Sequence, residues 1–557
     1  MHTFSKKMID GARGLEPADT IFENASIFNP YTCSWDKGIF AVKNGFVLGI
    51  GDYTGNTVKD CAGQYIVPGL IDAHVHIESS LLTPPEYARL VALHGTTTVI
   101  ADPHEIANVA GISGLDYMLA SRKNTAIDIL FMLPSCVPAT PADVGGAVLD
   151  ATDLRRYIGH EGVLGLGEMM NVPGVLDGDP GIIRKFAISG IRDGHAPGLS
   201  GKDLNAYLLA GLQSDHECTM LAEAEEKLKK GMYIFIREGS TERNIEALIS
   251  LVSAMTVPRC CFATDDCHPD LLMDDGHIDR CIRRAVACGL SPELAIRMAT
   301  LSPAERFGLA DRGVLAPGRR ADFCIIDDPE KFVIRQVFRN GKEMSLAAPS
   351  PRLLFPPTIL CSSPQPDAIR ITGSGIARVI GLIPGQIVTE SLRYSCTAQE
   401  IPDLTRDILK VVVCNRYRNT PCGIGLVHGF AFQNGAIACS ISHDAHNIVA
   451  TGTNDDLILR AIHEVIRAQG AMVAIQGANT AILPLDCAGL MSTLSYPEIV
   501  RQLKSLHEIT QQIGGIKDPF MYLSFIALTV IPALRVTDRG VFNGNIFREV
   551  PLFVDNS

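Results

Sequence analysis

The sequence has no long run of Lys and Arg residues, and 61 acidic side chains outnumber 49 basic ones, for a net charge of −12. Because binding to nucleic-acid phosphates depends on clustered cations, we predict no nucleic-acid partner. Aromatic residues are also scarce, at 6%. The single tryptophan, Trp35, is far in sequence from every candidate site residue named below, so no platform for stacking a flat ligand can be assigned.

Long apolar runs are missing too. The longest apolar stretch, residues 522–534, is too short to span a bilayer, and the first residues do not form an apolar leader, so we predict a cytoplasmic protein with no membrane partner. The 16 cysteines include no Cys-x-x-Cys pair. We therefore predict reduced cysteines that pack as small apolar side chains.

Eight apolar runs that end in polar or ionisable residues alternate with segments of helical character. The runs cover residues 65–76, 96–105, 127–138, 163–171, 188–195, 206–216, 232–238 and 260–266. Buried parallel strands read as continuous apolar runs, so the pattern predicts an α/β fold with a (β/α)₈ TIM-like barrel. An open doubly wound sheet is the alternative, but its usual glycine-rich phosphate turn is absent after the first run.

Short strand signals flank these runs, at 25–28, 39–43 and 46–50 before them and at 313–327 and 333–339 after them. We predict a small β-sandwich built from residues 1–66 and 310–347 around a barrel at 67–309. Prolines cluster in residues 348–367, which predicts a linker. Residues 368–557 then form a C-terminal α/β domain that opens with strands at 368–372 and 377–383.

Histidines and carboxylates follow the predicted strands. His74 and His76 end the first run in a His-x-His pattern, which places both on one face of a strand. Catalytic groups of a barrel lie at the carboxyl ends of its strands, so the later strand ends should meet this pair. The full set of predicted metal ligands is His74, His76, Glu168, His195, His216 and Asp265.

The ligand types limit the choice of metal. Imidazole and carboxylate without thiolate suit Zn, Mn or Fe(II). Since six protein ligands exceed what one catalytic ion with an open position needs, we predict two divalent ions, bridged by Glu168. Such a pair acidifies bound water and so supplies a nucleophile at neutral pH.

The sequence resembles the amidohydrolase superfamily and, within it, the adenine deaminases. The broader resemblance rests on PGLIDAHVH at 68–76 and GVLAPGRRAD at 313–322. The narrower one rests on HIESS at 76–80, ADPHEIANV at 101–109, GLGEMMN at 165–171, DGHAP at 193–197, SDHE at 214–217, ATDD at 263–266 and SHDAHN at 442–447. These segments span nearly the whole chain.

The resemblance implies a metal-dependent aminohydrolase that converts adenine and water to hypoxanthine and ammonia in purine salvage. It implies two ions, typically Mn or Fe(II), with a glutamate bridge where many relatives use a carbamylated lysine, and a homo-oligomer, either dimer or tetramer. A metal-activated hydroxide would attack C6 of the purine while Asp265, a ligand with one free oxygen, moves its proton toward the leaving amine. Glu217 is a second candidate proton carrier, although strand alternation places it opposite His216.

Two further groups are candidate contacts to an additional metal or to the substrate. Asp102, His104 and Glu105 follow the second predicted strand. His443, Asp444 and His446 follow an apolar strand in the last domain and could cover the barrel mouth, although a solvated turn explains them equally well. Two alternatives to adenine deamination remain: hydrolysis of a cyclic amide or another aminopurine, and a catalytically silent metal-binding scaffold.

Overall fold

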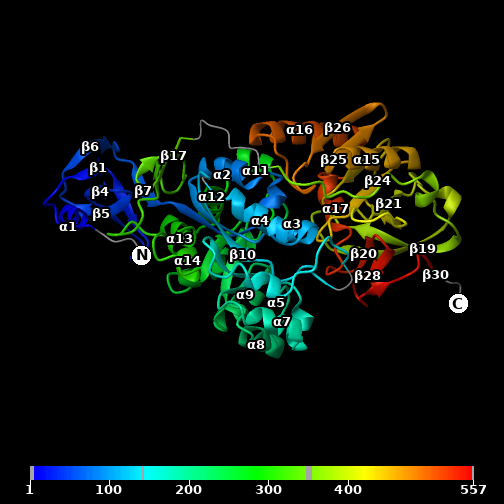
Figure 1. Cartoon of the computed structure of the whole chain (residues 1–557), viewed down its shortest axis with the longest axis horizontal. Coiled ribbons are helices and arrows are strands. Elements are labelled where there is room, and N and C mark those ends of the chain that lie inside the picture. The colour runs from blue at the N-terminus through cyan, green and yellow to red at the C-terminus, as the bar shows by residue number, and fades with distance from the viewer. Residues whose placement is uncertain (1–4, 124, 141–142, 346–353, 555–557) are drawn as a thin grey trace.

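The computed structural model describes residues 5–123, 125–140, 143–345 and 354–554. Three parts follow one another along the longest axis of the molecule (Figure 1). N-terminal β-sheets lie at one end, parallel strands with their helices lie in the middle, and a region rich in strands, residues 354–554, lies at the other end. We call this last part the C-terminal region.

The middle part is built on eight parallel strands within the described residues, arranged in two curled sheets of order β12-β11-β10-β9-β8 and β13-β14-β15. A parallel bridge from Val75 to Asp265 brings the end of β8 beside the chain that follows β15. The sheet therefore curls into a partial barrel whose carboxyl ends converge. The strands are β8 Leu70–Val75, β9 Thr96–Ala101, β10 Asp128–Leu133, β11 Val163–Met169, β12 Arg192–Gly194, β13 Ser214–Asp215, β14 Tyr233–Arg237 and β15 Cys260–Ala263.

Helices alternate with these strands, as the sequence predicts. Several have clear local causes: Asp150 caps α5 with a capping box, and Ser291 accepts the backbone N–H of Leu294 at the start of α13. The helices are α2 Pro84–Ala92, α3 His104–Ala110, α4 Ile112–Ser121, α5 Ala151–Arg155, α6 Val172–Leu176, α7 Pro180–Phe186, α8 Gly201–Leu209, α9 Leu221–Lys229, α10 Ile245–Leu248, α11 Pro269–Asp274, α12 Ile278–Ala287, α13 Pro292–Met298 and α14 Leu301–Arg306, with 3-10 turns η1 Ile77–Ser80, η2 Ile249–Leu251 and η3 Val257–Arg259.

The sixth predicted strand, 206–216, is mostly wrong. Helix α8 extends to Leu209, and only Ser214–Asp215 is extended. Leu204 and Tyr207 are spaced three residues apart and both are buried, which is helical periodicity, and Gly211 follows with φ 89°. The apolar run therefore combines the end of a helix with a very short strand.

The N-terminal sheets join segments from both sides of the parallel strands. Strand β16 pairs antiparallel with β7, which confirms that the late strands associate with the early ones. The two sheets have the orders β5-β4-β1-β6 and β18-β17-β16-β7-β2-β3. Their elements are α1 Lys6–Ala12, β1 Ala18–Glu23, β2 Ser26–Asn29, β3 Ser34–Lys37, β4 Ile39–Lys43, β5 Phe46–Gly51, β6 Gly55–Asp60, β7 Tyr65–Pro68, β16 Phe323–Ile326, β17 Ile334–Arg339 and β18 Lys342–Glu343.

The C-terminal region is a large, mainly antiparallel sheet with helices. Its order is β20-β19-β22-β21-β24-β23-β25-β26, with β30 beside β19, and β27-β28-β29 form a small sheet. The bounds are η4 Pro366–Ile369, β19 Ser374–Leu382, β20 Thr389–Thr397, η5 Ala398–Glu400, β21 Ile408–Cys414, β22 Gly423–His428, β23 Ala436–Cys439, β24 Ile448–Gly452, α15 Asp455–Arg467, β25 Ala471–Gln476, β26 Asn479–Pro484, α16 Tyr496–Ile513, α17 Pro519–Phe525, β27 Leu534–Thr537, β28 Gly540–Asn543, β29 Arg548–Glu549 and β30 Phe553–Val554.

Two predictions for this region differ from the structure or fall outside it. The segment 368–372 is not a strand, because Pro366 begins the 3-10 turn η4 there. Residues 346–353 of the predicted proline-rich linker lie outside the described residues, and 354–365 have no helix or strand.

One apolar core runs from α3 of the middle part into the C-terminal sheet: Ile106, Val109, Leu409, Val411 and Phe430 belong to it. The two parts therefore share one apolar core. Among the described helices, none is long and apolar enough to cross a membrane.

Candidate metal centre

The six predicted ligands come together at the carboxyl ends of the parallel strands. His74 lies in β8 and Glu168 in β11. The other four lie one or two residues after the ends of strands β8, β12, β13 and β15: His76, His195, His216 and Asp265. All are buried except His195, which is partly exposed. Convergence of strand ends thus produces the predicted cluster from residues far apart in sequence.

Glu168 lies at the centre of this cluster. Its Oε1 is 3.3 Å from Nε2 of His76, and its Oε2 is 2.8 Å from Nδ1 of His195 and 3.1 Å from Nε2 of His216. The two carboxylate oxygens therefore face two different groups of histidines. This is the arrangement expected of a carboxylate that bridges two ions.

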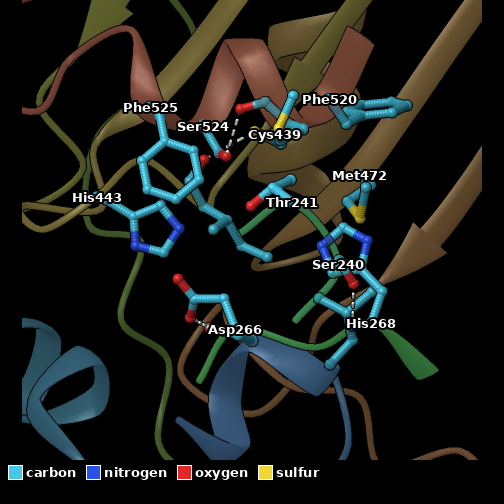
Figure 2. Close-up of a pocket in the computed structure, with 14 residues that line it drawn as sticks. Ser240, Thr241, Asp266, His268, Cys439, His443, Met472, Phe520, Ser524 and Phe525 are labelled. Atoms are coloured by element: carbon cyan, nitrogen blue, oxygen red, sulfur yellow. Dashed lines mark hydrogen bonds between the residues drawn. The ribbon is translucent and has the colours of Figure 1, made fainter. Parts of the chain in front are cut away.

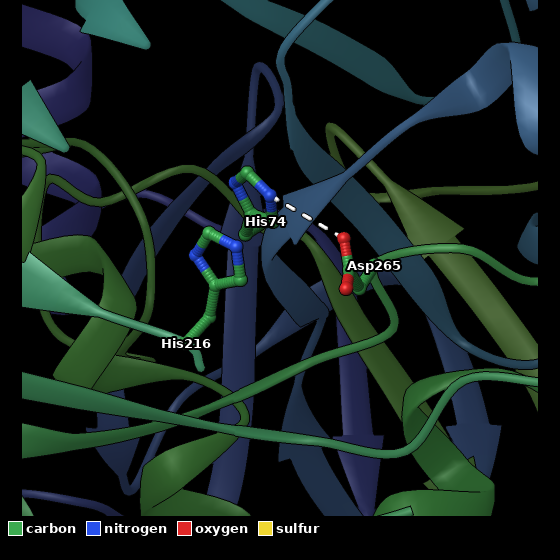
Figure 3. A group of neighbouring side chains, drawn as sticks. All are labelled: His74, His216 and Asp265. Carbon is green, nitrogen blue, oxygen red and sulfur yellow. Dashed lines mark ion pairs between the residues drawn. The ribbon is translucent and has the colours of Figure 1, made fainter. Parts of the chain in front are cut away.

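Asp265 closes the cluster on the side of β8. Its Oδ1 is 3.1 Å from Nε2 of His76 and 3.6 Å from Nε2 of His74. Figure 3 shows Asp265 beside His74 and His216, whose rings stack with centroids 4.2 Å apart. The second oxygen of Asp265, expected to be free, accepts a hydrogen bond from Arg237 at 2.8 Å. A neighbouring cation therefore occupies that oxygen.

The donor set fits a pair of divalent ions. Three overlapping groups each bring their ligand atoms within 4.8 Å of one another: His74, His216 and Asp265; His74, His76 and Glu168; and Glu168, His195 and His216. Imidazole nitrogens and carboxylate oxygens without thiolate suit Zn, Mn and Fe(II). The buried cluster of candidate ligands and the residue types support metal binding, and they leave the choice among these metals open.

The electrostatics of the cluster favour cations. Burial alone would lower the pKa of His216, but the Glu168 carboxylate raises it to about 9. Burial alone would raise the pKa of Glu168, but hydrogen bonds from His195 and His216 hold it well below its ordinary value. The Glu168 carboxylate is thus ionised at neutral pH. Protons and metal ions compete for the same histidine nitrogens.

Glu217 lies at this site, contrary to the expectation from strand alternation. Its Oε1 is 3.4 Å from Nε2 of His216. Strand β13 ends at Asp215, so the alternation of faces no longer applies one residue after His216. A short strand therefore allows two neighbouring residues to face the same centre.

Arg237 is a site residue that the sequence reasoning missed. It is the last residue of β14, and its guanidinium donates to Glu217 and to Asp265. Burial opposes its charge, but these two carboxylates raise its pKa above the ordinary value. The available signal was a cation at the carboxyl end of a buried strand, in the position where the other site residues occur.

Asp102 and His104 support the cluster from the end of β9. Asp102 accepts the backbone N–H of Glu168 at 2.9 Å through its side chain, and its carbonyl oxygen accepts from Nδ1 of His76 at 2.9 Å. Nδ1 of His104 is 3.3 Å from Oε1 of Glu168. Asp102 therefore orients two of the predicted ligands.

The C-terminal region reaches this part of the molecule. Nδ1 of His443 is 2.8 Å from Oε1 of Glu105, and Nε2 of His446 contacts the other oxygen of Glu105. Asp444 is buried in the same loop. The interpretation of 443–446 as a solvated turn is therefore wrong, because the apolar core shared with α3 buries this loop.

A cavity lies between the middle part and the C-terminal region, next to the cluster. Figure 2 shows Asp266 pointing into it from one side and His443 and Phe525 forming another side. The rings of His443 and Phe525 stack with centroids 4.4 Å apart. Asp266 has a carboxylate oxygen within 4.8 Å of ligand atoms of His76 and Asp265, so the cavity adjoins the metal cluster. Asp266 and Ser79 also form a hydrogen bond to each other beside it.

Comparison with known proteins agrees with this geometry. Residues 65–344 match the amidohydrolase family, and residues 386–548 match the adenine deaminase C-terminal domain. A curated adenine deaminase of Methanoregula boonei is 62% identical over 98% of both chains. The chain belongs to the adenine deaminase family.

Another member, from Methanoculleus marisnigri, is 60% identical over 92% of this chain and 99% of that protein. A solved structure described as an adenine deaminase is 17% identical, with a TM-score of 0.44, and covers 59% of this chain and 99% of that one.

Membership in the adenine deaminase family confirms the resemblance on which the sequence prediction rests. The chain is an amidohydrolase, and the part that matches the family's C-terminal domain contains His443, Asp444 and His446. In this chain that domain supplies one wall of the cavity, through His443 and Phe525.

Proposed function

We propose that this chain catalyses the hydrolytic deamination of adenine, which converts adenine and water to hypoxanthine and ammonia. The observation that carries the proposal is the buried cluster around Glu168, which opens beside a cavity between two parts of the chain. The 62% identity to a curated adenine deaminase supports the choice of substrate. In this reaction a C6–O bond forms, the C6–N bond breaks, and the amine leaves as ammonia.

Two divalent ions, Mn or Fe(II) with Zn as a further option, fit the ligand geometry. His74, His76 and Asp265 would hold one, His195 and His216 the other, and the two oxygens of Glu168 would serve both. When bound, such a pair supplies chemistry that the side chains lack, namely acidification of water at neutral pH.

Asp265 and Glu217 are the proposed proton carriers. Arg237 donates to both, so one guanidinium sets the relative position of the two carboxylates. Asp265 would accept the proton of the attacking water and pass it toward the leaving amine, and Glu217, whose side chain is 16% exposed, is the second candidate carrier of that same proton. If Asp265→Asn keeps both its metal and near-wild-type turnover, this role for Asp265 is wrong.

The cavity would hold the purine ring. His443 and Phe525 offer a flat aromatic side, and Asp266 offers an acceptor for a ring N–H. Phe525→Ala should raise KM for adenine more than it lowers kcat. The substitution removes a contact to the purine ring and leaves the proposed metal ligands around Glu168 intact. Phe547→Ala, at an exposed phenylalanine of the same region, is the matched control and should change neither constant.

The decisive experiment measures hypoxanthine formation from adenine by the purified full chain, with metal content determined on the same sample. Adenosine and cyclic amides serve as competing substrates, with ammonia release as the readout for the amines. Turnover of a cyclic amide in place of adenine would favour another amidohydrolase activity. No hydrolysis of any of them by metal-loaded protein would favour a silent scaffold.

The division of the chain into domains is also part of this proposal. We infer one (β/α)₈ barrel at 67–309, a β-sandwich from 1–66 and 310–347, and a C-terminal domain at 368–557 after the linker at 348–367. The bridge between Val75 and Asp265 supports closure of the barrel. A homo-oligomer, dimer or tetramer, and a cytoplasmic location stay predictions, which light scattering and cell fractionation can test.

A further inference from the structure

A second group of ligating side chains lies where α3 meets the loop after β23. It consists of Glu105 from α3 and His443 and His446 from the C-terminal region, with ligand atoms within 4.8 Å of one another. All three are buried. They are not members of the six-residue cluster around Glu168, and the reaction proposed above leaves Glu105 and His446 without a role.

The polar atoms of this group are poorly satisfied by hydrogen bonds. Oε2 of Glu105 and Nε2 of His446 contact each other, yet neither makes a hydrogen bond of acceptable geometry within the described residues. The backbone N–H of Ser442 points to Nδ1 of His446 at 3.3 Å, which keeps Nε2 turned toward Glu105. Buried polar atoms without hydrogen bonds are costly, so a further partner at this point is physically favoured.

Asp444, in the same loop, adds a further unpaired oxygen. Its side chain is buried, and Oδ2 lacks a hydrogen-bond partner among the residues that the structure describes. Asp444 interacts electrostatically with His104, Glu105 and His443. A second buried carboxylate, that of Asp444, therefore lies near the group formed by Glu105, His443 and His446.

We propose that Glu105, His443 and His446 bind a third divalent cation, separate from the pair at Glu168. Ligands about 2.0–2.2 Å from a Zn, Mn or Fe(II) ion at tetrahedral or octahedral angles lie about 2.8–3.6 Å apart. The 2.8 Å between Oε1 of Glu105 and Nδ1 of His443 is at the lower end of that range. An ion at Nε2 of His446 takes the place of a proton there and satisfies both unpaired atoms.

Such an ion would link the C-terminal region to the middle part and hold one wall of the cavity. It would fix the ring of His443, whose face stacks on Phe525. His104 lies between the two metal sites, with Nδ1 3.3 Å from Glu168 and Nε2 3.4 Å from Glu105. The third ion is thus structural, and it acts on substrate binding through the position of His443.

Anomalous scattering from crystals of the full chain grown with Mn²⁺ tests the site directly. We expect one peak per chain between Glu105, His443 and His446, in addition to any peaks at Glu168. Anomalous density confined to the Glu168 cluster, with Glu105 hydrogen-bonded directly to the two histidines, overturns the proposal. Because each site gives its own peak, failure here is distinguishable from failure of the proposed function.

Metal counting on variants gives an independent test. The double variant His443→Asn with His446→Asn should contain one Mn²⁺ per chain fewer than the wild type after equal exposure to the metal. The matched control is His463→Asn, at an exposed histidine on α15, which should keep the wild-type count. Equal counts in the wild type and the double variant overturn the proposal. If the double variant does not fold, the anomalous peaks decide.

Discussion

The two ends of the same parallel strands surround a carboxylate with different kinds of partner. At the carboxyl ends, histidines surround Glu168. At the amino ends, Asp128, the first residue of β10, is surrounded by Arg312, Arg320 and Arg339. The Asp128 site contains fixed cations of the protein itself, whereas the Glu168 site contains neutral or titratable nitrogens.

This difference distinguishes a structural site from a metal site. An arginine stays protonated and has no free lone pair, so it neutralises a carboxylate and cannot bind an ion. Burial raises the pKa of Asp128, but the three arginines more than offset this and hold it well below its ordinary value. Asp128 is therefore already paired, while Glu168 and its histidines still offer lone pairs to a metal. A buried carboxylate indicates function only when the identity of its partners is known.

The largest expected effect is the loss of metal and activity in the variant Glu168→Gln. Loss of the shared oxygen should release metal and lower kcat/KM roughly 10³-fold or more, because the ions contribute several kcal/mol of transition-state stabilisation. Metal analysis and an adenine assay on one preparation measure this. Glu161→Gln, at a highly exposed glutamate, is the control and should change neither quantity. Near-normal metal content and rate in Glu168→Gln would contradict the assignment.

Removing the carboxylate that the three arginines share should lower folding stability rather than activity. Asp128→Asn leaves three partly buried guanidinium groups without their shared anion, and we expect a loss of roughly 3 kcal/mol in the free energy of unfolding. Metal content and kcat should stay at the wild-type level. Urea denaturation followed by circular dichroism measures the change. A large loss of activity in folded Asp128→Asn protein would show that the two ends are not independent.

Arg237 is an arginine at the metal end, and changing it sharpens the comparison. Arg237→Lys keeps the charge but cannot hold Glu217 and Asp265 in the same geometry. We expect kcat to fall about 10-fold to 100-fold, with metal content unchanged, since a positioning contact is lost. The pH profile of kcat should shift as well, because both proton carriers lose a neighbouring guanidinium. A purely structural arginine would lower stability without moving that profile.

The smallest expected effect is a change in folding stability at acidic pH. The pKa of Asp128 is lower in the folded than in the unfolded chain, so its contribution to stability is present above the unfolded value near 4. It is lost as pH falls toward the folded value. Between about pH 4 and pH 2, the stability gap between wild type and Asp128→Asn should therefore narrow, by at most about 1.4 kcal/mol per pH unit. A gap independent of pH over this interval would mean that the pKa of Asp128 is the same in the folded and unfolded chains.

Much of the candidate metal site could be predicted from the sequence, because each candidate ligand is marked by the residues next to it. Each ligand stands at the end of an apolar run, and parallel strands bring their carboxyl ends together in any barrel of this kind. The same local reasoning failed for Glu217, because it assumed a longer strand than β13 provides. It also missed Arg237, since a single arginine at a strand end does not reveal which carboxylates it will meet.

The sequence by itself determined the alternation of strands and helices, the six side chains that converge as candidate metal ligands, and the family. Only the tertiary structure decided that His443 meets Glu105 across 338 residues, that Asp266 and Phe525 face one cavity, and that Arg237 joins two carboxylates. The physical reason is that strand and helix patterns depend on neighbouring residues, whereas these contacts depend on how the C-terminal region packs against α3. That packing buries a shared apolar core, and no short stretch of sequence encodes its register.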